Sequence, residues 1–196
     1  MEIKLGTEAT WELIKGIQPD AVVIATGGIP LIPQIPGLDR INVVTAQDVL
    51  SGKAETGQNV VILGGGLVGC ETGHYLASRG KRVAIIEVLR RMAGEMGPMV
   101  RRRLMDGLRE KQVTMLTNTK CDEITPGNVT VITGEGQRSI IPADTVVMAV
   151  GYKANDDLFK TLQGKVPELY CVGDSSQPQG IMEATNDGYR TGLSLQ

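Results

Sequence analysis

One stretch, residues 59–71, most constrains what this chain can fold into. Its sequence is N-V-V-I-L-G-G-G-L-V-G-C-E. The run from Val60 to Leu63 is apolar and mostly β-branched, which is typical of a strand that is buried on both faces. Residues 64–69 then match G-x-G-x-x-G and lead directly into a helix-like segment that ends near Arg79. This order of strand, glycine turn and helix predicts a dinucleotide-binding βαβ unit.

Each glycine of the motif has an expected task. Gly64 allows the tight turn, Gly66 lets the backbone come close to a pyrophosphate, and Gly69 lets the helix pack closely on the strand. The charge of the pyrophosphate would lie on the unpaired N–H groups at the start of the helix, where the helix dipole favours an anion. The motif therefore predicts that residues 64–69, including Gly65 and Leu67, form a pyrophosphate site.

The second half of the unit strengthens this interpretation. Residues 83–87, V-A-I-I-E, predict a second buried strand, and Glu87 follows Gly69 by 18 residues. An acidic side chain at this place accepts hydrogen bonds from the adenosine ribose hydroxyls. Arg90 and Arg91 follow closely and offer a clamp for a 2′-phosphate. We expect the Glu87 carboxylate, rather than Arg90 and Arg91, to determine which nucleotide binds better, because exposed ion pairs contribute only about 0–1 kcal/mol. The sequence therefore predicts that NADH binds better than NADPH.

The bulk composition excludes several other classes of function. The 196 residues carry a net charge of −2, and aromatic residues make up only 3% of the chain. Neither value supports nucleic-acid binding. No apolar run approaches the length of a membrane span, and no signal peptide opens the sequence, so we expect a soluble, cytoplasmic protein without membrane contact. Cys70 and His74 share a helix face, but the chain has one His and no ligand cluster, so no metal site is predicted.

The remaining segments predict an α/β protein. Buried strands are expected at 21–26, 41–45, 113–116 and 145–149, and three short strands at 121–125, 129–133 and 139–141 form an antiparallel meander. The proline-rich residues 29–37 predict a stiff crossing between domains. A strand at 169–172 ends in Gly-Asp, and a helix begins at Ile181 and runs, apparently unfinished, to Gln196.

Three stretches together resemble a known family. They are D-A-V-V-I-A-T-G-G at 20–28, G-G-G-L-V-G-C-E at 64–71 and E-L-Y-C-V-G-D at 168–174. The pattern is similar to that of two-dinucleotide-domain flavoproteins of the glutathione-reductase type. Within them, the chain resembles the C-terminal part of NADH:flavin oxidoreductases related to old yellow enzyme, which include 2,4-dienoyl-CoA reductase, 2-enoate reductase and trimethylamine dehydrogenase.

This resemblance implies a fold and a set of domains. A Rossmann-like nicotinamide-binding domain, a parallel sheet plus a three-stranded meander, would be inserted in a truncated FAD-binding domain. Residues 40–151 would form the NAD(P)-binding domain, and residues 1–39 and 152–196 would form the partial FAD-binding domain. The strand at 169–172 should then pair beside residues 21–25 rather than inside the sheet of residues 60–63.

The resemblance also implies which residues bind each cofactor. Glu71 would help to seat the nicotinamide carboxamide, and Gly151 would allow close approach of its ring. Asp174 would hydrogen-bond the FAD ribityl chain. The sequence departs from the family at Ala154, where proline is usual, and at Gln179, where arginine is common. The expected NAD set is Gly64, Gly65, Gly66, Leu67, Val68, Gly69, Glu71, Glu87, Arg91, Val150 and Gly151, and the expected FAD set is Ala25, Thr26, Gly27, Gly173, Asp174 and Ile181.

The resemblance finally implies a redox module that lacks its upstream partner. Such enzymes carry an upstream (β/α)8 barrel with FMN and a 4Fe-4S cluster, to which the FAD would pass electrons received from NADH. No acid–base pair is predicted, since hydride transfer needs proximity and exclusion of water. The isolated chain is expected to be inactive. Two alternatives stay open: a non-catalytic nucleotide-binding domain with a structural or regulatory role, and a fragment of a pyridine-nucleotide disulfide reductase.

Overall fold

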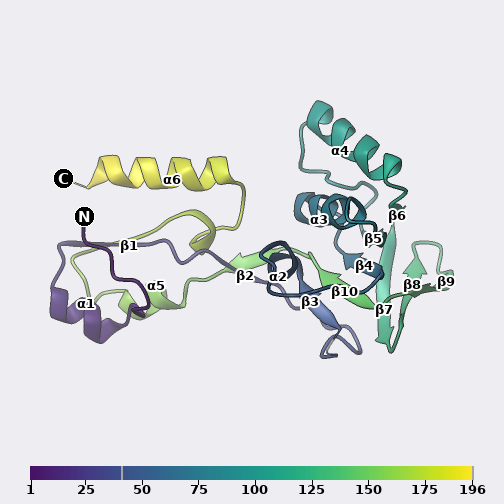
Figure 1. The fold of residues 1–196 in the computed structure, drawn as a ribbon. Coiled ribbons are helices and arrows are strands. Elements are labelled where there is room, and N and C mark those ends of the chain that lie inside the picture. The colour runs from purple at the N-terminus through teal and green to yellow at the C-terminus, as the bar shows by residue number, and fades with distance from the viewer. Residues whose placement is uncertain (41, 196) are drawn as a thin grey trace. The chain divides into compact units, whose positions relative to one another are not determined.

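The computed structural model describes residues 1–40 and 42–195. These residues divide into two compact units, which are treated separately below (Figure 1). Unit 1 combines residues 1–29 with the chain from 152 onward, and unit 2 is Pro30–Gly151. Ile41, at the start of one predicted strand, and Gln196, at the end of the last predicted helix, lie outside the described residues.

A five-stranded parallel sheet forms the centre of unit 2, and its strand order is β3-β10-β4-β5-β6. The sequence prediction of buried parallel strands is confirmed, although several strands are one or two residues shorter than expected. Their bounds are β3 Val43–Thr45, β4 Asn59–Leu63, β5 Arg82–Ile86, β6 Thr114–Leu116 and β10 Thr145–Met148.

Both faces of this sheet are covered, which explains why β4 is apolar at every position after Asn59. Val60 and Ile62 face one core with α2 (Ala46–Leu50), α3 (Leu67–Ala77) and α4 (Pro98–Glu110). Val61 and Leu63 face a second core with the meander. All four side chains are at most 3% exposed. Alternation along a strand sends successive side chains to opposite faces, so a strand with two covered faces needs an unbroken apolar run.

The meander was also predicted correctly. It comprises β7 (Thr119–Thr125), β8 (Asn128–Thr133) and β9 (Arg138–Pro142), which pair antiparallel in that order. Val129 and Val131 of β8 alternate with polar residues and lie in the second core of unit 2. The meander therefore closes one face of the parallel sheet and leaves the other face to the helices.

The proline-rich segment belongs to unit 2 rather than forming a free crossing. Ile35 and Leu38 pack against the second core, and the Pro36 carbonyl accepts a hydrogen bond of 2.8 Å from the Ile124 amide. A Cβ at Gly37 would lie 2.0 Å from the Ile124 carbonyl oxygen, so the two backbones are in close contact there. The boundary between the units thus lies at 29–30, ten residues before the expected one, because these partly buried side chains pack against the second core of unit 2.

Unit 1 is smaller and is built on β1 (Ala21–Ile24) and β12 (Glu168–Cys171), which pair in parallel. This confirms the prediction that the strand before Gly-Asp pairs beside residues 21–25. α1 (Trp11–Ile17) and α5 (Asp157–Leu162) enclose a core that includes Ile14, Ile24 and Leu162. A second pair, β2 (Gly28–Pro30) with β11 (Tyr152–Ala154), was not predicted, and a short helical turn, η1, spans Gly173–Ser175.

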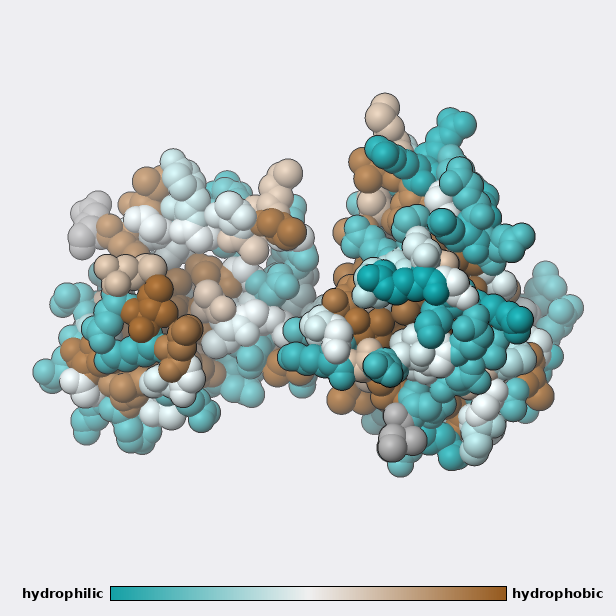
Figure 2. All heavy atoms as spheres, viewed as in Figure 1, coloured by the Kyte–Doolittle hydropathy of each residue, from teal (hydrophilic) through white to brown (hydrophobic). Residues whose placement is uncertain are grey.

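The last helix, α6 (Ile181–Ser194), has no buried residue. Ile181 is 89% exposed and Met182 is 80% exposed. Figure 2 shows apolar residues mixed with polar ones along this helix on the viewed surface of unit 1. The helix is attached through its contacts with η1, where the Asp187 carboxylate accepts a hydrogen bond of 3.2 Å from the Gly173 amide.

Candidate dinucleotide site and its relatives

The glycine turn, Glu87 and the residues after β10 meet where three parallel strands end. The Gly64 amide donates to the Ile86 carbonyl at 2.9 Å, which brings the ends of β4 and β5 together. The Ala149 amide donates to the Leu63 carbonyl at 2.8 Å, which places the residues after β10 on the other side of β4. Ligands of open α/β sheets bind at this edge, outside the carboxyl ends of the strands.

The glycine turn, residues 64–69, has the close contacts that its sequence predicts. Gly64 has φ +104°, a backbone conformation that L side chains rarely adopt, and an added Cβ would lie 2.3 Å from the Ala149 carbonyl oxygen. An added Cβ at Gly69 would lie 1.9 Å from the Gly64 carbonyl oxygen. A side chain at Gly69 would therefore force α3 away from the turn, and one at Gly64 would clash with the residues that follow β10. Gly66 is the N-cap of α3, and Leu67 and Val68 form its first turn.

Glu87 lies directly after β5, and its side chain is turned back to the glycine turn. One carboxylate oxygen accepts a hydrogen bond of 2.6 Å from the Gly65 amide, and the other accepts one of 2.8 Å from the Leu89 amide. The residue is 8% exposed. A carboxylate offers about four lone-pair sites, so two backbone bonds leave capacity for ribose hydroxyls. Glu87 therefore has a structural role that its spacing alone did not indicate.

Residues 88–97, here called the strap loop, lie against the glycine turn. The Ala93 amide donates to the Gly65 carbonyl at 2.6 Å, and Met92 and Ala93 are at most 3% exposed. An added Cβ at Gly65 would lie 2.2 Å from the Met92 sulfur. The Glu95 carboxylate accepts a hydrogen bond of 2.5 Å from the Leu67 amide. An acidic side chain of the chain itself thus caps the first turn of α3.

Cys70 lies under the same turn and is not suited to redox chemistry. Its thiol donates to the Gly65 carbonyl at 3.3 Å, and burial, assisted by the charges of Glu95 and Glu87, raises its pKa to about 12. Only the thiolate is a good nucleophile. Cys70, Cys121 and Cys171 are all free thiols. The described residues therefore offer no disulfide of their own for reduction.

The other expected NAD residues lie on the surface around this centre. Glu71 is exposed on α3 and lines a groove of about 710 Å³ between α3 and α4, together with His74 and Met96. Val150 and Gly151 follow β10, and Gly151 has φ +105°. Arg91 is exposed in the strap loop, with no side-chain hydrogen bond or ion pair among the described residues. The structure brings the glycine turn and Glu87 together, and leaves Arg91 free.

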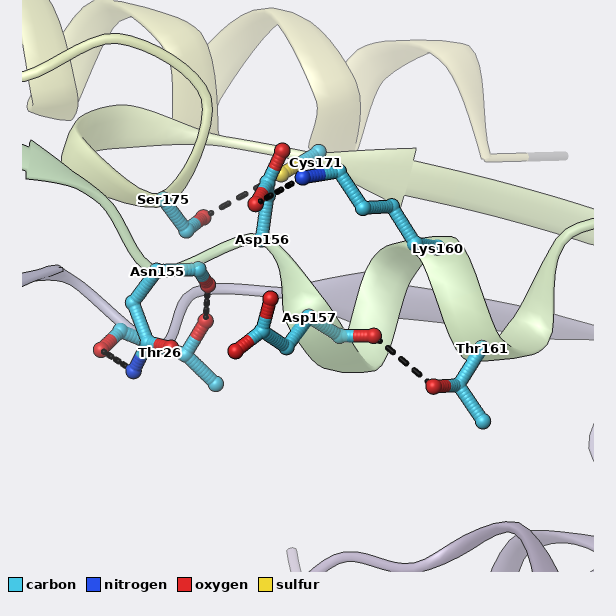
Figure 3. A network of polar contacts seen from close by, with 8 residues as sticks. All are labelled: Thr26, Asn155, Asp156, Asp157, Lys160, Thr161, Cys171 and Ser175. Atoms are coloured by element: carbon cyan, nitrogen blue, oxygen red, sulfur yellow. Dashed lines mark hydrogen bonds and ion pairs between the residues drawn. The ribbon is translucent and has the colours of Figure 1, made fainter.

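The expected FAD residues of unit 1 lie after β1 and β12. Ala25, Thr26 and Gly27 follow β1, and Asn155 is bound to this turn in three ways. The Asn155 amide donates to the Gly27 carbonyl at 3.1 Å, its side chain donates to the Thr26 carbonyl at 3.3 Å, and the Thr26 hydroxyl donates to the Asn155 carbonyl at 2.6 Å. Figure 3 shows the two contacts made by these side chains.

The turn after β12 is fixed by a buried hydroxyl. Ser175 is fully buried, and its oxygen lies 3.0 Å from the Ile24 carbonyl and 2.7 Å from the Val172 carbonyl. Gly173 and Asp174 begin this turn, and the Asp174 carboxylate accepts a hydrogen bond of 3.1 Å from the Gln179 amide. Ile181 begins α6 and is exposed. Parallel pairing of β1 and β12 therefore places the Ala-Thr-Gly and Gly-Asp turns side by side.

Sequence reasoning missed three residues that hold these turns. Glu95, Asn155 and Ser175 carry no motif in common. Asn155 directly follows Ala154, one of the two departures from the family, but its place in the sequence indicated no partner. Glu95 and Ser175 act through contacts that depend on the path of the chain in space.

No helix of residues 1–40 and 42–195 is both long and apolar enough to cross a membrane. Within the part of the chain that the structure describes, no three His, Cys, Asp or Glu side chains gather in a group that could hold a metal ion.

A parallel sheet whose central strand enters a helix through G-x-G-x-x-G, with an acid after the next strand, defines a dinucleotide-binding domain. Two units with such strand-end glycine turns, one interrupting the other in sequence, define a class of nucleotide-dependent redox proteins. The chain belongs to the pyridine nucleotide-disulphide oxidoreductase family, whose model matches residues 7–188.

Comparison with individual proteins shows which members of this family the chain is similar to. The chain is 36% identical to an NADH oxidase of Thermoanaerobacter brockii over 100% of this chain and 31% of the relative. It is 33% identical to a cinnamate reductase of Clostridium sporogenes, over 100% of this chain and 29% of that protein. It matches the structure of a 2-naphthoyl-CoA reductase with a TM-score of 0.93 and 35% identity, over 98% of this chain and 29% of that one.

These matches confirm the resemblance to NADH:flavin oxidoreductases related to old yellow enzyme. A histamine dehydrogenase from Rhizobium sp. 4-9 shares the fold, with a TM-score of 0.83 at 21% identity. The chain spans about 30% of the length of the relatives that it matches.

Proposed function

We propose that this chain binds NADH in unit 2 and that unit 1 contributes to the FAD site of a longer flavin-dependent oxidoreductase, of which the chain is the electron-entry part. The observation that carries the proposal is the glycine turn of unit 2. There, the close contacts at Gly64 and Gly69 and the position of Glu87 meet the requirements of a dinucleotide site. The family and the relatives, which include a protein named NADH oxidase, support the same assignment.

In this proposal the backbone of unit 2 holds the diphosphate. The first turn of α3 presents N–H groups and the positive end of the helix dipole, which favour an anion. Glu87 accepts from the adenosine ribose hydroxyls while it keeps the Gly65 amide in place. Glu71, Val150 and Gly151 belong to the nicotinamide end.

In unit 1, the same logic assigns the two turns after β1 and β12 to FAD. Ala25, Thr26 and Gly27 approach the pyrophosphate, and Asp174 approaches the ribityl chain. Asn155 and Ser175 hold these turns without touching the flavin, since the Asn155 side-chain amide and the Ser175 hydroxyl bond to backbone carbonyls and the Asn155 carbonyl accepts from the Thr26 hydroxyl. Ile181 begins the helix whose N-terminus follows the Gly-Asp turn.

When bound, the nicotinamide supplies a hydride and the flavin accepts it, which needs alignment and exclusion of water rather than proton transfer. The residues of this chain therefore bind and orient, and no side chain is assigned as a catalytic acid or base. An upstream domain with FMN and an iron–sulfur cluster would receive the electrons. Its presence in a longer protein is supported by the small share of each relative that the chain covers.

The proposal is tested by titrating the chain with NADH and with NADPH in a calorimeter. We expect NADH to bind about tenfold more tightly, equivalent to about 1.4 kcal/mol, because Glu87 repels a 2′-phosphate. Glu87→Gln should narrow this ratio, and Arg91→Gln should leave NADH affinity unchanged. Equal affinities in the parent chain would remove Glu87 from this role, and no binding of either nucleotide would refute the proposed function.

A further inference from the structure

The Glu95 carboxylate occupies a backbone N–H group at which the proposed function places the diphosphate. Its carboxylate oxygen lies 2.5 Å from the Leu67 nitrogen, in the first turn of α3, and 3.2 Å from where a Cβ of Gly66 would be. These are the positions that the G-x-G-x-x-G motif provides for a diphosphate. A single N–H group cannot serve a carboxylate and a phosphate oxygen with good geometry at once, and the two anions repel each other.

The strap loop is built so that Glu95 can leave without disturbing the rest of the loop. Its first part is anchored, because Met92 and Ala93 are buried and the Arg101 side chain donates to the Met92 carbonyl at 2.7 Å. In its second part Gly94, Glu95 and Gly97 are exposed, whereas Met96 is half-buried and packs against the first core of unit 2. An added Cβ would meet nothing nearer than 3.8 Å at Gly94 and nothing within 4 Å at Gly97. The two glycines can therefore serve as hinge positions that let Glu95 turn away from α3 while Met96 stays packed.

We propose that Glu95 is a built-in competitor for the diphosphate, an autoinhibitory contact that the nucleotide must displace. The inference rests on the proposed function, since it concerns the same site. A small anion would have to break the Glu95 contact, and it makes no further contacts that offset this loss of free energy. A nucleotide also binds through its adenosine and ribose, which offset the loss. Glu95 thus favours whole dinucleotides over inorganic anions at this helix terminus.

The test compares the parent chain with Glu95→Gln and with the matched control Glu55→Gln. Glu55 is an exposed acid of the same unit, without a side-chain hydrogen bond or ion pair among the described residues. Calorimetry is run with three probes: NADH, ADP and adenosine. Because Gln removes the charge and retains an oxygen, the folded structure is preserved. We expect Glu95→Gln to bind NADH and ADP about two- to fivefold more tightly, the range that corresponds to an exposed carboxylate at a helix N-terminus.

Adenosine carries no diphosphate, so its affinity should be the same in all three chains, and the Glu55→Gln control should match the parent with every probe. Hydrogen exchange should also show faster exchange of residues 94–97 in the parent when NADH is added. Equal NADH affinities in the parent and Glu95→Gln would overturn the inference while leaving the proposed function intact. An equal gain for adenosine would overturn it as well, and absence of NADH binding to both chains would refute the proposed function together with it.

Discussion

Replacing Glu87 with Ala should lower the unfolding free energy of unit 2 even when no nucleotide is bound, because Glu87 also holds the glycine turn. The carboxylate accepts two backbone hydrogen bonds, from Gly65 at 2.6 Å and from Leu89 at 2.8 Å, and it is almost fully buried. Hydrogen bonds to a charged group contribute about 1.5–3 kcal/mol each, and a buried amide left without a partner costs about 1–3 kcal/mol. Allowing for partial rehydration of the Leu89 amide, we expect a loss of about 3 kcal/mol.

Two measurements report this loss. Calorimetric unfolding of the whole chain should show a transition lowered by about 10–15 °C, at roughly 4 °C for each kcal/mol in a domain of this size. Native-state hydrogen exchange of the β4 amides, Val60 to Leu63, reports on unit 2 alone. Glu87→Gln, which keeps one acceptor oxygen, should fall between the parent and Glu87→Ala.

Glu55→Ala serves as the control, because it deletes an exposed carboxylate from the same unit. Its unfolding free energy should stay within about 0.5 kcal/mol of the parent. A loss below about 1 kcal/mol in Glu87→Ala would refute the reasoning, since it would show that the two hydrogen bonds do not hold the glycine turn.

Three further predictions follow from other parts of the chain. Hydrogen bonds from the Asn59 amide, the Asn59 side chain and the Gln58 amide lower the pKa of Asp144. The ionised Asp144 carboxylate therefore stabilises the fold fully above pH about 4, its pKa in the unfolded chain. This stabilisation is lost as the pH falls through the lowered pKa of the folded state. Melting temperatures between pH 2 and 6 should therefore fall less in Asp144→Asn than in the parent, and parallel curves would contradict this. Cys70, buried and with a pKa of about 12, should resist iodoacetamide at pH 8 until the chain is denatured, as peptide mass spectrometry would show; equal rates with and without denaturant would contradict it. The chain contains one G-x-G-x-x-G motif, at 64–69, so it should purify colourless and reduce no dye with NADH, and a preparation with stoichiometric FAD would contradict this.

The sequence predicted best those features that are imposed by local pattern. The apolar run of β4 identified a strand covered on both faces, and the glycine spacing identified the turn, because backbone geometry and close packing at Gly64 and Gly69 exclude other residues. The pairing of β1 with β12 was also predictable, but only from resemblance, since nothing in either strand specifies its partner.

Other features depended on the path of the chain and escaped prediction. The strand β2 contains Pro30, and the three residues of β2 and of β11 form no apolar run that would mark a strand. Glu95 lies in a loop without periodicity, so nothing in the sequence indicated that it would cap α3. The spacing of Glu87 suggested a contact with ribose, and its hydrogen bond to Gly65 became visible only when the turn and the strand end were placed together.

The nested arrangement of the two units has a consequence for the order in which the chain folds during synthesis. Unit 2 is continuous, so it can be complete before the ribosome has made β12, whereas β1 must wait for residues 168–171. The two ends of unit 2 are joined by a hydrogen bond of 2.9 Å from the Leu31 amide to the Gly151 carbonyl. Once unit 2 has folded, it acts as a short bridge in place of a long flexible loop between β1 and β12. The loop to be closed is then roughly sixfold shorter, which lowers the entropic cost of pairing by about 1.5 kcal/mol. The inserted unit therefore assists the assembly of the unit that it interrupts.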